Sequence, residues 1–338
     1  MNPVVKRGAS VLAGALATAI LSGCASTGLD NLGTYQKQDL PEAQQMPSKA
    51  ELKGGKSKVV IFEVQDGNIA ESEQANVGVS MTGELEKYIR DAGAELVDRS
   101  LAQKLKKEIR RAEMEGVTGY EGPPVGDFAV RGKVSQASFG SEFTEARRWT
   151  DDDGNVHTSP PECTYTANVT ANLEIYSLPS LKTAESFQVE GTVDTSEETR
   201  SSNCNGSGQG LLREAAAEAV QVKRDKLQNF FAPKGFVTER RTKEDDNVFR
   251  VTLGGELGAK EGKEVRIFKV VEEKNDLTGE TITEKRKVAE GIITNQVNPG
   301  TAWIRVSEPE QAKKVRMGHR VKVHYERGLM EKGMAIIN

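Results

Sequence analysis

Three cysteines are the residues of this 338-residue chain best suited to chemistry. A thiolate can be acylated, can join a second thiol in a disulfide, or can bind a metal ion. Cys24 lies near the start of the chain, directly after the small residues Ser22 and Gly23. Cys163 and Cys204 lie far from it, each among polar neighbours. The first cysteine and the later pair therefore need separate interpretations.

The residues before Cys24 have the layout of a secretory signal. Lys6 and Arg7 form a short cationic region, and residues 11–20 form an apolar run. This run is shorter than the roughly 20 residues that a membrane-spanning helix needs, but it has the length of a signal's apolar region. Residues 21–24 (Leu-Ser-Gly-Cys) then resemble the lipobox of bacterial lipoproteins, in which the signal is cleaved before the cysteine and the thiol is acylated.

This resemblance implies a mature protein that begins at Cys24 and is held to a membrane by its acyl chains. Each buried CH₂ contributes about 0.8 kcal/mol, so several chains give stable anchoring. Ala25 and Ser26 follow the cysteine, with no Asp beside it, and this resembles an outer-membrane address. We expect an outer-membrane lipoprotein whose body faces the periplasm. The alternative is an ordinary cleaved signal followed by a chance cysteine.

Cys163 and Cys204 form an even pair in a compartment that is expected to be oxidising, so we predict a disulfide between them. The alternatives are two free thiols or a metal site. His157, His319 and His324 do not have metal-ligand spacing to the cysteines, and we expect no metal.

Composition and the remaining motifs argue against several other classes of function. The formal net charge is −4 and aromatic residues make up 5% of the chain, so neither an electrostatic footprint nor a stacking platform for nucleic acid is evident. Residues 206–210 (Gly-Ser-Gly-Gln-Gly) match no phosphate-loop spacing and are interpreted as a flexible loop. Residues 151–155 (Asp-Asp-Asp-Gly-Asn) would need a calcium ligand at Trp149, so we predict a hairpin tip there. No acid–base or nucleophile–base pair stands out, and we expect neither enzyme activity nor a cofactor.

Hydrophobic patterning divides the chain into four parts: a signal peptide (1–23), a flexible lipid-anchored tether (24–56), an α+β domain (57–233) and an all-β domain (234–338). The tether is rich in Gly, Gln, Lys, Ser and Pro without a period, and some 30 such residues would hold the body roughly 30 Å from the lipid.

The predicted α+β domain begins β-α-β-α and continues as a mixed or antiparallel sheet with a closing helix. Period-2 alternation is clearest over residues 165–175, and helical spacing over 77–92 ends at Gly93. The strands are expected at 59–64, 94–97, 127–134, 165–175 and 187–193, and the helices at 77–92, 101–112 and 211–231.

Short strands separated by Gly-, Asn- and Pro-bearing turns predict a small barrel or sandwich at the end of the chain. They are expected at 248–253, 265–271, 287–294, 302–306 and 320–325.

Two features of the predicted helices suggest contacts. A run of basic residues crowds the helix at 101–112: Lys104, Lys106, Lys107, Arg110 and Arg111. A solvated helix face is the default interpretation, and the alternative is docking to an acidic partner or an anionic cell-wall polymer.

Phe230, Phe231 and Phe236 cluster between the domains, where we expect interdomain packing before partner binding.

Residues 57–231 resemble the curli-assembly CsgG family of lipoproteins, and also the N-terminal domain of TolB and the lipoprotein activators of penicillin-binding proteins. No single motif is diagnostic, and the ordered set carries the resemblance. The matching segments are Val59–Val64, Thr82–Leu85, Leu96–Arg99, Phe128–Gly132, Ala171–Tyr176 and the closing Ala-rich helix.

Residues 248–325 resemble the C-terminal domain of the flagellar protein FlgT more weakly. The segments are Leu253–Gly255, Gly262–Val265, Ala289–Ile293 and Val315–Val321.

The two candidate hairpins that would form a curli-type pore carry charges where lipid-facing strands need apolar residues. Glu142 and Glu145 lie in the first (134–175), and Asp194 and Glu197 in the second (190–210). A charge at the bilayer midplane costs about 2–4 kcal/mol for Lys or Arg and somewhat less for Asp or Glu, so we expect that the pore function is not retained.

The resemblances imply a non-enzymatic periplasmic binding or assembly factor for a curli-like or flagellar-type surface structure. A homo-oligomeric ring is a hypothesis taken from the family, and the partners are expected to be other envelope proteins. An oligomeric secretion pore and an activator of a peptidoglycan synthase are the alternatives.

Overall fold

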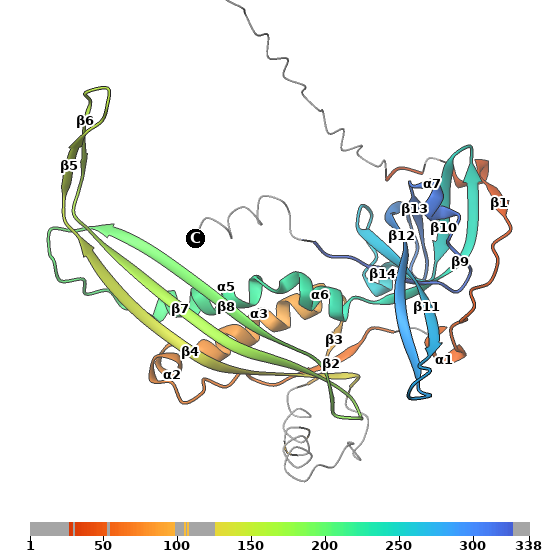
Figure 1. Ribbon diagram of the computed structural model, residues 1–338, viewed down its shortest axis with the longest axis horizontal. Coiled ribbons are helices and arrows are strands. Elements are labelled where there is room, and N and C mark those ends of the chain that lie inside the picture. The colour runs from red at the N-terminus through yellow and green to blue at the C-terminus, as the bar shows by residue number, and fades with distance from the viewer. Residues whose placement is uncertain are drawn as a thin grey trace, which may run out of the picture.

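The computed structural model describes residues 27–29, 31–52, 55–98, 105, 107 and 126–326. Two β units lie side by side along the long axis of the molecule (Figure 1). One is a five-stranded sheet with helices on one face, and the other is a closed antiparallel barrel of six strands. The fold is therefore α+β with mostly strands, and the second unit is a barrel rather than a sandwich.

The first unit opens with strand β2 (Lys58–Ile61), whose Val59 and Val60 are buried. It pairs in parallel with β3 (Glu95–Leu96) and β4 (Phe128–Thr144). Between β2 and β3 lie α2 (Ala70–Ala75), which the sequence analysis missed, and α3 (Val77–Asp91). Helix α3 ends at Gly93, whose φ of +94° suits glycine. The helix predicted at 101–112 lies outside the described residues except for 105 and 107, so the β-α-β-α order stays a prediction.

Three long antiparallel strands, β4, β7 (Glu162–Ser177) and β8 (Lys182–Glu198), make the rest of this sheet. Alternate residues of β7 are buried, from Cys163 to Ile175. The strand predicted at 127–134 covers less than half of β4, which runs on to Thr144. A bulge between Val134 and Gln136 shifts the register there, and this breaks the period-2 pattern that the sequence analysis followed.

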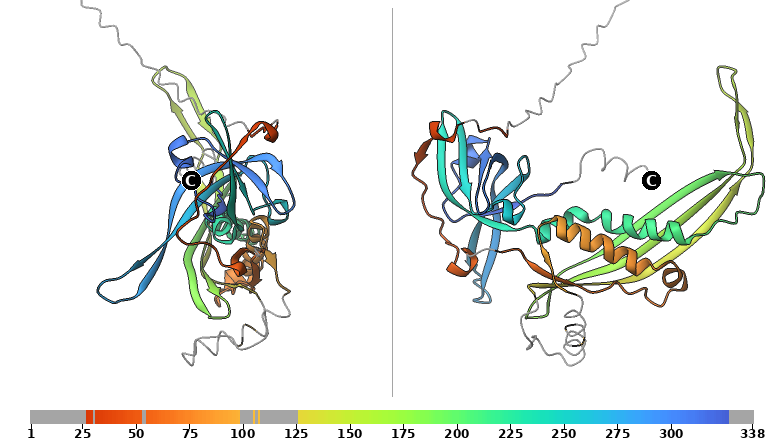
Figure 2. Two further views of the ribbon diagram at one scale, coloured as in Figure 1. Left: turned by 90° about the vertical axis from the view of Figure 1, so that its right-hand side faces the viewer. Right: turned by 180° about the vertical axis from the view of Figure 1, so that it is seen from behind.

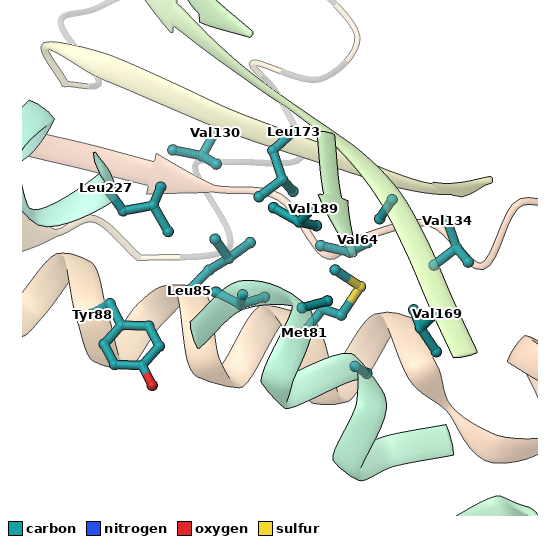
Figure 3. Packing of buried hydrophobic residues seen from close by; sticks show 14 of the residues in the cluster. Val64, Met81, Leu85, Tyr88, Val130, Val134, Val169, Leu173, Val189 and Leu227 are labelled. Carbon is teal, nitrogen blue, oxygen red and sulfur yellow. The ribbon is translucent and has the colours of Figure 1, made fainter. Parts of the chain in front are cut away.

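Helices α3, α5 (Gln209–Gln221) and α6 (Arg224–Phe231) cover the apolar face of the sheet (Figure 2). Met81 and Leu85 of α3 and Leu227 of α6 belong to one buried cluster with Leu173 of β7 (Figure 3). The prediction of a single helix at 211–231 is wrong, because the helix is interrupted at Val222 and Lys223. Neither residue is a Gly or Pro, so nothing in the local sequence marks the break.

The barrel has the strand order β9-β10-β13-β12-β11-β14, and β14 pairs back onto β9. Its interior is filled by apolar side chains that include Phe249, Ile267 and Ile304. The strands are β9 (Lys234–Lys243), β10 (Asp246–Val251), β11 (Glu264–Lys274), β12 (Thr281–Val297), β13 (Ala302–Val306) and β14 (Arg320–Val323). Two short helical segments, η2 (Gly255–Leu257) and α7 (Pro309–Ala312), interrupt the connections.

Strand β9 was missed by the sequence analysis because its sequence is largely polar. Buried Glu239 forms ion pairs with Arg241 (2.7 Å) and Arg250 (3.0 Å) on the barrel surface. The ion pairs neutralise the charge of Glu239, which allows it to be buried in a strand. In the sequence alone, such a charged segment is typical of a loop.

The prediction of a flexible tether over residues 24–56 is wrong for the part that the structure describes. This segment contains η1 (Leu32–Thr34), β1 (Gln36–Gln38) and α1 (Lys49–Leu52). Leu29 is buried against Val248 and Trp303, and β1 pairs antiparallel with β9. Backbone pairing needs no apolar side chains, so a polar composition did not reveal it.

The contact of α5 with β8 depends on Gly191. A Cβ at this position would lie 2.1 Å from the carbonyl oxygen of Ala215 and 2.4 Å from the backbone nitrogen of Ala219. The helix backbone therefore rests directly on the strand at this point.

We expect Gly191→Ala to lower the free energy of unfolding by about 1–3 kcal/mol, because the helix must move away from the sheet. Gly210→Ala is the matched control, since no atom lies within 4 Å of its Cβ position. Urea unfolding would measure both, and equal stability of the two variants would contradict the close contact.

Candidate binding surfaces

A two-stranded hairpin of β5 (Arg147–Thr150) and β6 (Val156–Ser159) projects from the end of the long sheet, far from the barrel (Figure 1). Trp149 lies opposite His157, with the rings stacked 5.4 Å apart. Trp149 is 51% exposed and Val156 is 53% exposed. The register pairs Trp149 with His157 and Val156 with Thr150, so the two apolar side chains are exposed on opposite faces of the hairpin. Exposed apolar side chains on a protruding tip are a feature of binding surfaces.

The turn at residues 151–155 is the hairpin tip that the sequence predicted. One Asp151 oxygen accepts hydrogen bonds from the backbone N–H groups of Asp153 and Asn155. The other lies 2.7 Å from His157 Nε2. These interactions, that with His157 first, lower the pKa of Asp151. The carboxylate is thus used to close the turn.

Cys163 and Cys204 form a disulfide, with their Cα atoms 5.7 Å apart. It ties the connection between β8 and α5 to the start of β7, close to where the hairpin leaves the sheet. The prediction of a flexible loop at 206–210 is incomplete. A Cβ at Gly206 would meet the ring of Tyr165 at 2.4 Å, and one at Gly208 would meet the ring of Phe139 at 2.3 Å. These glycines allow close packing on aromatic rings.

Strand β8 forms one edge of the five-stranded sheet. Glu190, Asp194 and Glu198 are exposed along it. Unpaired backbone groups on an edge strand can accept another strand, and charged side chains restrict which partner does so. The segment proposed as a second pore hairpin, residues 190–210, instead continues β8 to Glu198, paired throughout with β7, and then returns to α5.

Two cavities lie where the barrel meets the first unit. The larger, about 1060 Å³, is bounded by α3, α6 and the barrel, and its charged residues have both signs. The second, about 700 Å³, is lined mainly by strands of the barrel. Neither cavity was predicted from the sequence, because the lining residues come from distant segments.

Asn229 of α6 holds the two units together at this junction. Its Oδ1 accepts from the backbone N–H of Tyr325 (2.9 Å), and its Nδ2 donates to the carbonyl of the same residue (2.8 Å). His324 Nδ1 lies 3.1 Å from the same Oδ1. Lys322 donates to the carbonyls of Asn229 and Phe230.

The aromatic cluster predicted between the domains is divided. Phe230 and Phe231 pack with Phe128 of β4, at ring distances of 5.2 and 5.8 Å. Phe236 instead lines the second cavity.

Three sequence predictions lie outside the described residues. They are the signal peptide at 1–23, the acylated Cys24 and the basic run of the helix at 101–112, of which only Lys107 is described. Within the described segments, no group of three or more His, Cys, Asp or Glu side chains could hold a metal ion. No helix among the same residues has the length and apolar character to cross a membrane.

No protein-family model matches this chain, and no curated protein matches it. Three solved structures show a likeness at 11–13% identity: a PelC dodecamer from Paraburkholderia phytofirmans, a minor lipoprotein from Acinetobacter baumannii and a lipoprotein from Neisseria meningitidis. They cover 57%, 52% and 49% of this chain, and 96%, 97% and 96% of their own, with TM-scores of 0.23, 0.25 and 0.19. At TM-scores this low the likeness carries no argument, and the CsgG and FlgT resemblances stay predictions.

His319 is buried in the barrel wall, where its Nδ1 accepts from the backbone N–H of Arg316 (3.1 Å). Burial, and then the charges of Arg316 and Lys269, lower its pKa to about 4. The folded protein therefore holds this imidazole neutral at a pH where the unfolded chain protonates it.

Since the unfolded state binds the extra proton between pH 6.5 and about 4, stability falls as the pH drops through this window, by about 3 kcal/mol from this residue. His319→Asn should flatten that part of the curve of unfolding free energy against pH. His157→Asn on the exposed hairpin is the control. A curve for His319→Asn that parallels the wild type would contradict the assignment.

Proposed function

We propose that this protein is a lipid-anchored outer-membrane binding or assembly factor, with no enzymatic activity, that serves a cell-surface structure from the periplasmic side. The observation that carries the proposal is the position of Thr27 and Leu29 relative to the hairpin. Thr27 and Leu29 dock on the barrel, while the hairpin of β5 and β6 lies at the far end of the molecule (Figure 1).

Anchoring through Cys24 would set the orientation of this elongated body. Asn295 donates a backbone hydrogen bond to Thr27, and its side chain accepts one from Leu29. Only Ala25 and Ser26 lie between Cys24 and Thr27, so the barrel would lie within about 10 Å of the acylated cysteine. This replaces the roughly 30 Å expected for a flexible tether.

The proposed partner contacts are then the surfaces farthest from the barrel. The exposed Trp149 and Val156 provide apolar contact area, and the free edge of β8 provides backbone groups in an acidic setting. A basic extended segment of an envelope protein suits such an edge, because it would pair with the backbone and with the carboxylates. A ring of copies of this chain remains a hypothesis from the family resemblance.

Cys24→Ser tests the anchor. We expect loss of fatty-acid labelling, accumulation of the unprocessed chain and loss of ordinary fractionation with the outer membrane, because the acceptor thiol is gone. Cys163→Ser, which removes a cysteine of the disulfide, should keep the label. Normal processing and unchanged membrane fractionation of Cys24→Ser would refute the location and the orientation.

Photo-crosslinking in intact cells tests the contacts. A photoreactive residue at Val156 should give a defined adduct with an envelope protein, identified by mass spectrometry, whereas the same residue at Lys314 on the barrel should not. Liposome conductance of the purified protein distinguishes the pore alternative. Identical background patterns from both positions would count against the hairpin as a contact surface.

A further inference from the structure

The second cavity has one wall made by the outer surface of the barrel. Side chains of β9, β11, β12 and β14 line this wall, and the other lining residues are Glu51, Asp127 and residues 55–57 and 232–233. Its volume of about 700 Å³ lies in the range of small-molecule sites.

Positive charge is concentrated on this wall. Lys234 and Lys322 are directly opposite each other in the antiparallel pairing of β9 with β14. Directly opposite residues share a face of the sheet with their Cβ atoms close, so two like charges there cost stability. Arg320 lies two residues earlier on β14, and Lys285 lines the cavity from β12.

These cations are only partly neutralised by the protein. Glu51 pairs with Arg320 at 2.7 Å, and Lys322 donates to carbonyls at the end of α6. Within the described part of the chain, the side chains of Lys234 and Lys285 have no hydrogen bond or ion pair.

The pKa values reflect this crowding of positive charge. The pKa of Lys322 is lowered to about 8, by burial first and then by Lys234 and Lys285. The pKa of Lys234 is lowered as well, by burial and then by Lys285 and Arg320, although its side chain still reaches solvent in the cavity.

The same cavity has an apolar surface. Phe236 is on the outer side of the barrel and is only 4% exposed. Phe268 and Val270 of β11 and Pro233 extend this surface. A ligand that fills the cavity would therefore contact cationic and apolar side chains at once.

We propose that this cavity binds a small amphiphilic anion, a phosphate or carboxylate carried on an apolar group. Lys234 and Lys285 contact the anion, and Phe236 and Phe268 contact the apolar part. The inference does not depend on the proposed assembly role, since it concerns a different surface from the hairpin and the β8 edge.

The test uses the full chain held in nanodiscs of phosphatidylcholine, with 1-naphthyl phosphate as the probe and fluorescence anisotropy as the measurement. We expect saturable binding that weakens roughly fivefold or more in Lys234→Gln and in Lys285→Gln, which corresponds to the loss of one charge contact. Lys243→Gln, at the other end of β9, is the matched control and should bind as the wild type does. Without ligand, Lys234→Gln should raise the melting temperature, because it removes the like-charge pair.

Competition identifies the source of the anion. Displacement of the probe by hexyl phosphate supports a free ligand, and displacement by phosphatidylglycerol in the discs supports a lipid headgroup. Inorganic phosphate competing as strongly as hexyl phosphate would overturn the apolar contact. Unchanged probe affinity in both lysine variants would overturn the site, whatever the outcome for the hairpin.

Discussion

The apolar face of β7 is the constraint on which the first unit depends. Residues from Cys163 to Ile175 alternate between buried and partly exposed positions along the whole strand. A sheet with one such face must be covered along its length, and α3, α5 and α6 provide the cover. Gly191 of β8 has no side chain, so the backbone of α5 can lie in direct contact with the strand at this position. The strands run on past the helices and end in the hairpin, which is left free for contacts.

The two units are fixed to each other by polar contacts at one junction. Asn229 binds both backbone groups of Tyr325, and Lys322 binds the last carbonyls of α6. These groups are partly buried, and their hydrogen bonds are specific in geometry, since a shifted arrangement would leave them unsatisfied. Both cavities border this junction, since His324 and Tyr325 line the larger one and Lys322 lines the second. An elongated body with a fixed angle between its parts can place the hairpin at a defined distance from the barrel.

Sequence patterns predicted the elements whose burial is strictly periodic. The alternation in β7 and the helical spacing from Val77 to the stop at Gly93 each reflect one face turned to a core. The barrel strand from Ala302 to Val306 was found instead as a short apolar run, and it is buried on both faces. The misses have a different physical origin. The bulge after Val134, the backbone pairing of Gln36–Gln38 and the ion pairs of Glu239 depend on partners far away in the chain. The cationic cavity was missed for the same reason, because Lys234 and Lys285 meet only in the folded barrel.

The docked N-terminal segment also determines how a mechanical load would travel through the molecule. The Tyr35 hydroxyl donates to Asp246 at 2.5 Å, and Asp246 pairs with Arg305 at 3.0 Å. The antiparallel pairing of β1 with β9 begins at the next residue, Gln36. A pulling force on the segment before Tyr35 would therefore have to break these polar contacts and the backbone pairs of β1 before it reached the barrel core. Several contacts that share a load resist detachment more than contacts that break one at a time.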